Sequence, residues 1–155
     1  MEDVIPLLHN ISSVQRLLDF ARLVIALGYE KIVVTKAYGA AAQHGLGELG
    51  RIAYKAGTSL IVLPDLPDAV ELLRPDEVII VSKDHAREHV DPASPIEARG
   101  RVLVAFNGGD PDFTHQEASL GRPVYFRGLK SRIGPAGEAA LLLYPLTLRG
   151  DGDSG

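Results

Sequence analysis

The sequence predicts a single α/β domain with a mainly parallel sheet and helices on both faces. Short apolar runs alternate with amphipathic stretches, and these runs are apolar at successive positions, as strands buried on both faces are. No linker or internal repeat interrupts the pattern. With 155 residues, 46% of them hydrophobic, the chain can bury one core. We expect one domain at residues 1–148 and a disordered, glycine-rich tail at 149–155.

The first half of the chain alternates strands and helices. Continuous apolar or β-branched runs predict strands at residues 4–8, 32–35, 59–63 and 77–81. Apolar residues at helical spacing predict helices at residues 12–27, 46–56 and 67–73. Gly28 and Gly57 follow the first two helices, where a glycine commonly ends a helix.

The second half begins with a long polar, proline-bearing excursion at residues 83–100. Strands are then predicted at residues 102–106 and 123–126, with a helical turn at 114–119 between them. An apolar helix over residues 135–148 closes the domain.

Composition excludes several classes of protein. The chain has no cysteine, which rules out disulfides and thiolate chemistry. A net charge of −4 argues against a general nucleic-acid coat. Its first residues carry no cationic signal region, and no apolar run approaches the roughly 18 residues of a membrane span. We expect a soluble, cytoplasmic protein.

Two glycine-bearing loops follow the last two strands, one at 107–110 (Asn-Gly-Gly-Asp) and one at 127–134. Glycines at strand ends expose backbone N–H groups to a ligand, so a binding site is predicted there; an ordinary turn is the alternative. The strand predicted at 102–106 is not followed by G-x-G-x-x-G, and the sequence contains no P-loop motif. The second loop is basic, and its neighbourhood contains Arg122, Arg127, Lys130 and Arg132 without an acid. This excess favours a phosphate or nucleic-acid contact over a solvated loop.

Two further patterns would bind metal. His85-Ala-Arg-Glu-His89 matches the H-x-x-E-H zinc motif, but its surroundings favour an exposed loop over the required helix. Asp110, Asp112, His115 and Glu117 could form a nuclease-type metal site, although no strand bears the usual E-x-K triplet. We therefore assign no metal ligands, and no role to His9, Arg16 or His44.

Three segments together resemble the SPOUT class (SpoU-type) of RNA methyltransferases, and in particular small archaeal proteins called either SpoU-like methylases or RecB-family nucleases. The first segment has an arginine six residues before a glycine, here Arg22 and Gly28, followed by a strand. The second is the strand and glycine loop at 102–109. The third runs from Gly128 to Tyr144 and ends in Leu-Leu-Leu-Tyr, but has Arg132-Ile133-Gly134 where the family has S-L-N.

The resemblance implies a C-terminal trefoil knot within the domain at 1–148, a homodimer, and S-adenosylmethionine as cofactor. It implies methyl transfer to an RNA (rRNA or tRNA), commonly to a ribose 2′-hydroxyl, with Arg22 as the catalytic residue. The implied cofactor-binding residues are Asn107, Gly108, Gly109, Arg127, Gly128, Leu129, Ile133 and Gly134. The implied RNA-binding residues are Arg122, Lys130 and Arg132. Two alternatives stay open: a metal-dependent nuclease using Asp110, Asp112 and Glu117, and a non-catalytic knotted dimer that binds cofactor or RNA.

Overall fold

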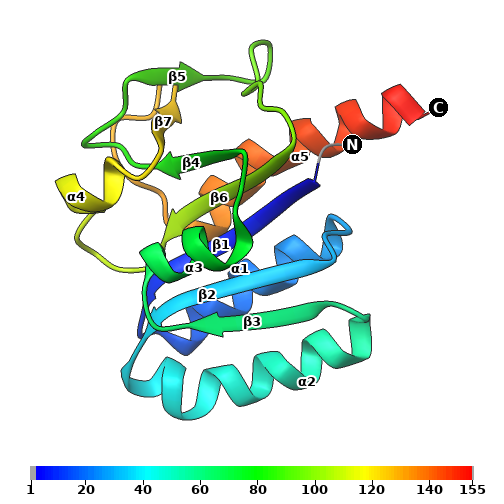
Figure 1. Ribbon diagram of the computed structural model, residues 1–155, viewed down its shortest axis with the longest axis vertical. Coiled ribbons are helices and arrows are strands. Elements are labelled where there is room, and N and C mark those ends of the chain that lie inside the picture. The colour runs from blue at the N-terminus through cyan, green and yellow to red at the C-terminus, as the bar shows by residue number, and fades with distance from the viewer. Residues whose placement is uncertain (1–2, 155) are drawn as a thin grey trace.

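Seven parallel strands form one sheet in the computed structural model, which describes residues 3–154 and the side chains of residues 3–149 (Figure 1). The strand order is β3-β2-β1-β6-β4-β7-β5, and every neighbouring pair is parallel. The strands are β1 (Asp3–Ile11), β2 (Lys31–Ala37), β3 (Ser59–Leu63), β4 (Glu77–Val81), β5 (Glu88–Val90), β6 (Arg101–Asn107) and β7 (Arg122–Phe126). Because all strands run the same way, their carboxyl ends meet at one edge.

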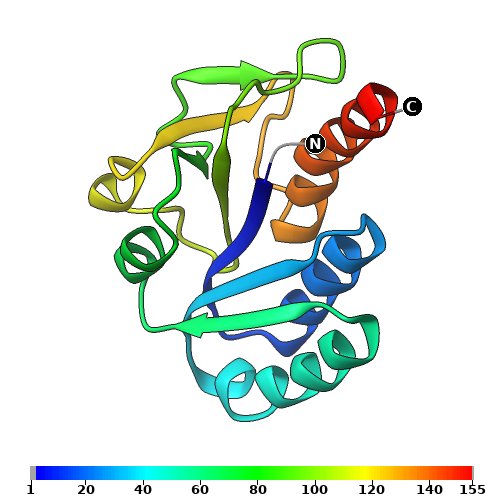
Figure 2. The same cartoon turned by 45° about the vertical axis from the view of Figure 1, so that its right-hand side comes forward.

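Helices cover both faces of this sheet (Figure 2). One face packs against α1 (Val14–Ala26), α2 (Leu46–Ala56) and α5 (Pro135–Ser154), and this side contains the larger core cluster. The other face is covered by α3 (Leu66–Leu73), with α4 (His115–Ala118) on the same side. A π-helical turn, η1 (Ala41–Gly45), leads into α2. The predicted fold class, a parallel α/β sheet with helices on both faces, is confirmed.

Local sequence explains where most helices begin and end. The side chain of Ser13 caps α1, and Gly28 follows its end with φ +90°, a backbone conformation that glycine adopts without strain. Asp65 caps the start of α3 and Thr114 caps the start of α4, each as the first residue of a capping box. Gly57 ends α2 in the left-handed conformation, as predicted.

The predicted elements agree with the structure in kind, and β3, β4 and α2 agree residue for residue. β1 extends to Ile11, three positions beyond its predicted end at residue 8, so His9 lies within the strand. The excursion at 83–100 contains a strand that was not predicted, β5, which forms by pairing with β7. α5 continues past residue 148 to Ser154, through residues assigned to a disordered tail; Gly155 lies outside the described residues. The division at residue 148 and the trefoil knot stay predictions.

The central strands β1 and β6 lie side by side, and their connections lead to opposite halves of the sheet. From β1 the chain continues to β2 and β3, whereas β6 borders β4. In open parallel sheets, ligands bind outside the carboxyl ends of strands where the connections diverge in this way. Within residues 3–154, no helix is long and apolar enough to cross a membrane.

Candidate functional site at the carboxyl edge of the sheet

A row of buried polar side chains crosses the carboxyl edge of the sheet. His9 on β1 is in register with Thr35 on β2 and with Asn107 on β6, and all three are buried. Because residues in register on parallel strands share a face, these side chains point toward the side covered by α3. Ser82, directly after β4, is two positions beyond Ile80 of the same face, and its buried hydroxyl has no partner among the described residues.

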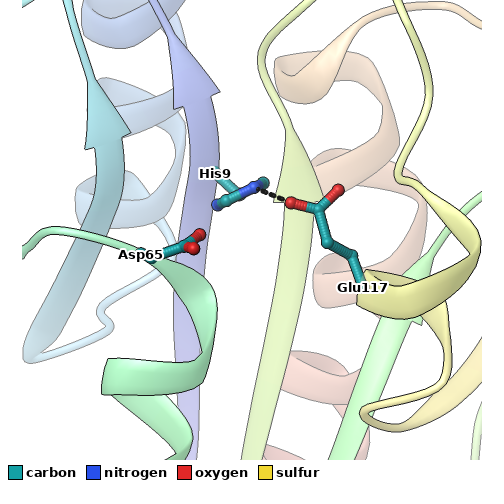
Figure 3. Close-up of side chains that lie close together, drawn as sticks. All are labelled: His9, Asp65 and Glu117. Atoms are coloured by element: carbon teal, nitrogen blue, oxygen red, sulfur yellow. Dashed lines mark hydrogen bonds and ion pairs between the residues drawn. The ribbon is translucent and has the colours of Figure 1, made fainter.

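His9 is the centre of a compact cluster with Glu117 and Asp65 (Figure 3). Its Nδ1 lies 2.8 Å from Oγ1 of Thr35, and its Nε2 lies 2.5 Å from Oε2 of Glu117. One ligand atom from each of His9, Asp65 and Glu117 lies within 4.8 Å of the other two. Three elements distant in sequence supply them: β1, the start of α3 and α4.

The protein environment sets the charges in this cluster. Burial lowers the pKa of His9 below its usual value, and the nearby Glu117 offsets only part of that effect. Burial alone would raise the pKa of Glu117, but hydrogen bonds from Thr114 and His9, together with the charge of His9, outweigh it and lower this pKa. Near neutral pH the pair is therefore a neutral imidazole beside a carboxylate, with Nε2–H donating to Glu117 and the Thr35 hydroxyl donating to Nδ1.

Both carboxylates are held by the starts of their own helices. Oε1 of Glu117 accepts the backbone N–H of Thr114 at 2.9 Å, which leaves Oε2 to face His9. Oδ1 of Asp65 accepts the N–H of Leu66 at 2.8 Å. The cluster is therefore anchored before any ligand binds.

Beside this cluster lies the first glycine loop, at residues 107–110. The Gly108 N–H donates to the carbonyl of His9 at 2.8 Å, and Oδ1 of Asn107 accepts the Gly109 N–H at 3.0 Å. Arg16 of α1 donates to the Gly108 carbonyl at 3.1 Å and pairs with Asp110 at 3.0 Å. Arg16 was given no role in the sequence analysis, yet it lies on this loop.

The second glycine loop, at residues 127–134, contacts the first through one side chain. Arg132 donates to the carbonyl of Gly109 at 2.9 Å and to that of Asp110. Gly128 and Gly134 both have φ +88°, so the backbone takes turns here that other residues would resist. Lys130 and Ile133 are exposed. The structure therefore brings together the two loops predicted to bind cofactor.

Behind the second loop is an apolar pocket of about 160 Å³ between β5, β7 and α5. Leu129 and Arg127 line it, together with Phe126 and Leu142. The guanidinium of Arg127 pairs with Asp91 at 3.1 Å. Two of the predicted cofactor-binding residues thus border a pocket with an apolar lining.

A buried acid also lies behind this loop. Glu138 on α5 is 1% exposed and accepts a hydrogen bond from the Tyr125 hydroxyl at 2.7 Å. Burial raises the pKa of Glu138 to about 7, although the hydrogen bond from Tyr125 and the charge of Arg132 act in the opposite direction. Burial likewise raises the pKa of Tyr125.

Two predicted site residues lie elsewhere. Arg22 is exposed on α1, and its side chain makes no hydrogen bond or ion pair with the residues that the structure describes. Arg122 begins β7, at the opposite end of that strand from Lys130 and Arg132. Its guanidinium pairs with Glu88 at 2.7 Å and Glu77 at 2.9 Å, so these carboxylates already neutralise it.

Neither of the two metal-binding patterns considered from sequence forms a single site in the structure. His85 lies in a turn and His89 on β5, so the H-x-x-E-H residues form no helix, as expected. Of the four nuclease-type residues, Glu117 faces His9 and Asp110 pairs with Arg16. Asp112 instead accepts backbone N–H groups of Asp84 and Phe113. Glu117 is therefore shared with a cluster that sequence spacing did not indicate.

Sequence comparison relates the chain to proteins named as nucleases. A sequence model of the family described as "RecB-family nuclease (DUF2122)" matches residues 39–145. The "Putative type II restriction enzyme ApeKORF2002P" of Aeropyrum pernix is 52% identical over 151 residues, covering 97% of this chain and 96% of that protein. The "Putative type II restriction enzyme MjaORF1200P" of Methanocaldococcus jannaschii is 35% identical over 141 residues, covering 90% and 93%.

Structural comparison relates the chain to methyltransferases. The SpoU methyltransferase AviRb from Streptomyces viridochromogenes matches with a TM-score of 0.77 at 13% identity, and its complex with AdoMet with 0.75. The match to AviRb covers 99% of this chain and 62% of AviRb. The TrmH/SpoU tRNA modifying enzyme of A. aeolicus matches with a TM-score of 0.70 at 10% identity, covering 99% and 78%. At these identities the likeness shows the fold alone, and that fold is the one the resemblance implied.

Proposed function

The chain belongs to the RecB-family nuclease (DUF2122) family, and we propose that it is an S-adenosylmethionine-dependent RNA methyltransferase that acts in the cytoplasm on a ribose 2′-hydroxyl. One observation carries the proposal: the SpoU methyltransferase fold extends over 99% of the chain. The two contacting glycine loops lie at the carboxyl edge of that fold, where parallel sheets bind ligands.

The residues at this edge fit the cofactor. The apolar pocket beside Leu129 suits a purine ring, and the loops at 107–109 and 127–134 offer backbone groups to its polar atoms. The buried hydroxyl of Ser82 has no partner within the described part of the chain, and Ser82 follows β4, which lies between β6 and β7 in the sheet. S-adenosylmethionine supplies an electrophilic methyl group. We assign its binding to Asn107, Gly108, Gly109, Arg127, Gly128, Leu129, Ile133 and Gly134.

The chain's own task is to hold the acceptor hydroxyl in line and ease the loss of its proton. Arg16 contacts the first glycine loop, and its side chain is 46% exposed, so it can bind an RNA phosphate there. The resemblance predicted Arg22 for this role. The hydrogen bond and ion pair that Arg16 makes with the first glycine loop favour Arg16 over Arg22 for this role. We propose to compare the methyl-transfer activity of variants at the two positions.

We assign RNA contacts to Lys130 and Arg132, which lie on the loop that borders the pocket. Arg122 stays a predicted contact, but its two carboxylate partners would have to release it first. An rRNA or a tRNA would meet this edge of the sheet from the solvent side.

We also propose that the chain acts as a homodimer. α5 exposes Leu141, Tyr144 and Leu148, each 42–53% exposed, and Ile133 precedes the helix with 45%. Residues three, four and seven apart share one face of a helix, so the three α5 side chains form an apolar stripe. A second copy packed on α5 would bury this stripe next to the cofactor loop.

Calorimetry with S-adenosylmethionine, followed by transfer of a labelled methyl group to total RNA, tests the proposal. We expect cofactor binding, and label that stays in alkali-resistant dinucleotides, because 2′-O-methylation blocks alkaline cleavage at the modified ribose. A folded sample that binds no cofactor at millimolar concentration would rule the activity out. Cofactor binding without transfer to any RNA would leave the non-catalytic knotted dimer.

A metal-dependent nuclease is the second candidate, because both curated relatives carry restriction-enzyme names and Glu117 lies in a group of possible metal ligands. In the form predicted from sequence it would use Asp110, Asp112 and Glu117. It requires Mg²⁺- or Mn²⁺-dependent cleavage of nucleic acid that is lost on Asp112→Ala. Cleavage that persists in EDTA would exclude it.

A further inference from the structure

We propose that His9, Asp65 and Glu117 bind one divalent transition-metal ion of the Mn²⁺ or Zn²⁺ class. The basis is their juxtaposition: an imidazole nitrogen and two carboxylate oxygens, from three separate elements, lie within 4.8 Å of one another (Figure 3). This site is independent of the proposed methyl transfer, because none of its residues is assigned to the cofactor or the RNA.

The imidazole of His9 is fixed in place like that of a metal ligand. The ring is 1% exposed, lies against Phe113 with centroids 5.7 Å apart, and contacts Thr35 through Nδ1. A ligating histidine usually has its second ring nitrogen held by a neighbouring polar group, which sets the tautomer. The Thr35 hydroxyl can do this in either state: it donates to Nδ1 without an ion and accepts from Nδ1–H when Nε2 binds one.

The two carboxylates are similarly prepared. Each has one oxygen hydrogen-bonded to the first residues of its own helix, so its position is set without an ion. Two carboxylates beside a single imidazole form a site whose negative charge a divalent cation would match. One nitrogen and two oxygens are a mixed donor set that suits Mn²⁺ or Zn²⁺ better than Mg²⁺, which prefers oxygen alone.

Binding requires only a small adjustment. Zinc-ligand distances are about 2.0–2.2 Å, so two ligands of one ion lie about 3 Å or more apart. Nε2 of His9 and Oε2 of Glu117 are now 2.5 Å apart, and a modest movement of the half-buried Glu117 would admit the ion. Asp65 is exposed, so the site is closed by the sheet on one side and open to solvent on the other. Three protein ligands and an open side leave positions for water or a substrate oxygen.

The alternative is a closed His9–Glu117 hydrogen-bonded pair that binds nothing. Calorimetric titration of the full, chelator-stripped chain with Mn²⁺, Zn²⁺ and Mg²⁺ distinguishes the two, without S-adenosylmethionine or RNA. We expect saturable binding of one Mn²⁺ or Zn²⁺ per chain. No saturable binding, or binding of Mg²⁺ alone, would overturn the proposal.

Variants locate the ion. Asp65→Asn and Glu117→Gln each remove a proposed ligand and should each weaken metal binding about 100-fold or more. Thr35→Val should weaken it about 10-fold, since losing a group that orients a ligand costs about 10–100-fold. Asp65 is exposed, so Asp65→Asn keeps the test valid even if Glu117→Gln fails to fold. His115→Gln is the matched control, because His115 lies on α4 near His85, with ring centroids 6.0 Å apart, but outside the cluster. Loss of binding in His115→Gln with retention in Asp65→Asn would place the ion at His85 and His115 and refute the proposal.

Discussion

The carboxyl edge of this sheet has two regions that are built in different ways. Over β1 and β2, side chains converge: His9, Asp65 and Glu117 bring one nitrogen and two carboxylates together. Over β6, β4 and β7 the polar groups are largely backbone atoms of two glycine loops, next to an apolar pocket. The first region suits a small cation, and the second suits an organic ligand with a flat apolar part. The difference shows that one edge of a parallel sheet can present two chemistries a few residues apart.

The largest effect is expected on the rate of methyl transfer, from a change at Arg16, whose partly exposed side chain contacts the first glycine loop. Arg16→Ala should lower methyl transfer about 100- to 1,000-fold, equivalent to roughly 3–4 kcal/mol of transition-state stabilisation, while cofactor affinity changes little. Arg22→Ala is the matched control on the same helix and should change transfer less than about threefold, because its exposed side chain makes no hydrogen bond or ion pair with either loop. Single-turnover rates with saturating cofactor measure both. The reverse ranking would return the catalytic role to Arg22.

The second-largest effect is expected on the free energy of unfolding, from the buried acid Glu138 behind the second glycine loop. Folding raises the pKa of Glu138 from 4.5 to about 7, so its contribution to stability is complete below pH 4.5 and is lost as pH rises through 7. Raising the pH from 4.5 to 8 should therefore lower the free energy of unfolding by about 3 kcal/mol through Glu138. Glu138→Gln, which still accepts the Tyr125 hydrogen bond, should remove most of that decline and be the more stable protein at pH 8.

Urea unfolding at pH 5 and pH 8 measures this difference, with Glu71→Gln as the control because Glu71 is an exposed acid on α3. A parent protein whose stability is the same at both pH values would contradict the assignment. So would a Glu138→Gln protein that declines as steeply as the parent.

How much of this arrangement the sequence could predict differs between the two regions. The glycine loops were found because Gly108, Gly109 and Gly128 lie within two residues of the ends of apolar strands, which is a local pattern. The His9 cluster was missed because its members are far apart: Asp65 begins a helix, and His9 follows the residue where the strand was predicted to end. Its register with Thr35 and Asn107 is a property of the assembled sheet.

The same distinction explains two other misses. β5 is only three residues long, and it exists because of its pairing with β7, more than thirty positions later in the chain. Arg16 and Arg22 cannot be ranked by sequence spacing alone, since six residues along a helix place them on different faces and only one face meets the glycine loop. Only the assembled fold reveals which of the two arginines reaches the loop.

A smaller effect tests whether the two regions act separately. Leu129→Ala should weaken S-adenosylmethionine binding about 10-fold, because shortening this pocket side chain removes roughly 1–2 kcal/mol of apolar contact. Metal affinity should not change. Asp65→Asn should show the opposite result in the same two calorimetric titrations. If Leu129→Ala weakened both ligands equally, the edge would be one coupled site and the contrast between the regions would fail.

The smallest effect concerns Ser82, whose buried hydroxyl meets no hydrogen-bond partner among the residues that the structure describes. An unsatisfied buried hydroxyl costs about 1 kcal/mol or more, so Ser82→Ala should leave the unfolding free energy unchanged or raise it slightly. If the bound cofactor is the missing partner, the same change should weaken cofactor binding severalfold, and protein stability and cofactor affinity will then move in opposite directions. Thermal unfolding and calorimetry on one pair of samples measure both. Unchanged cofactor affinity would remove Ser82 from the binding site and restrict the cofactor to the two loops and the apolar pocket.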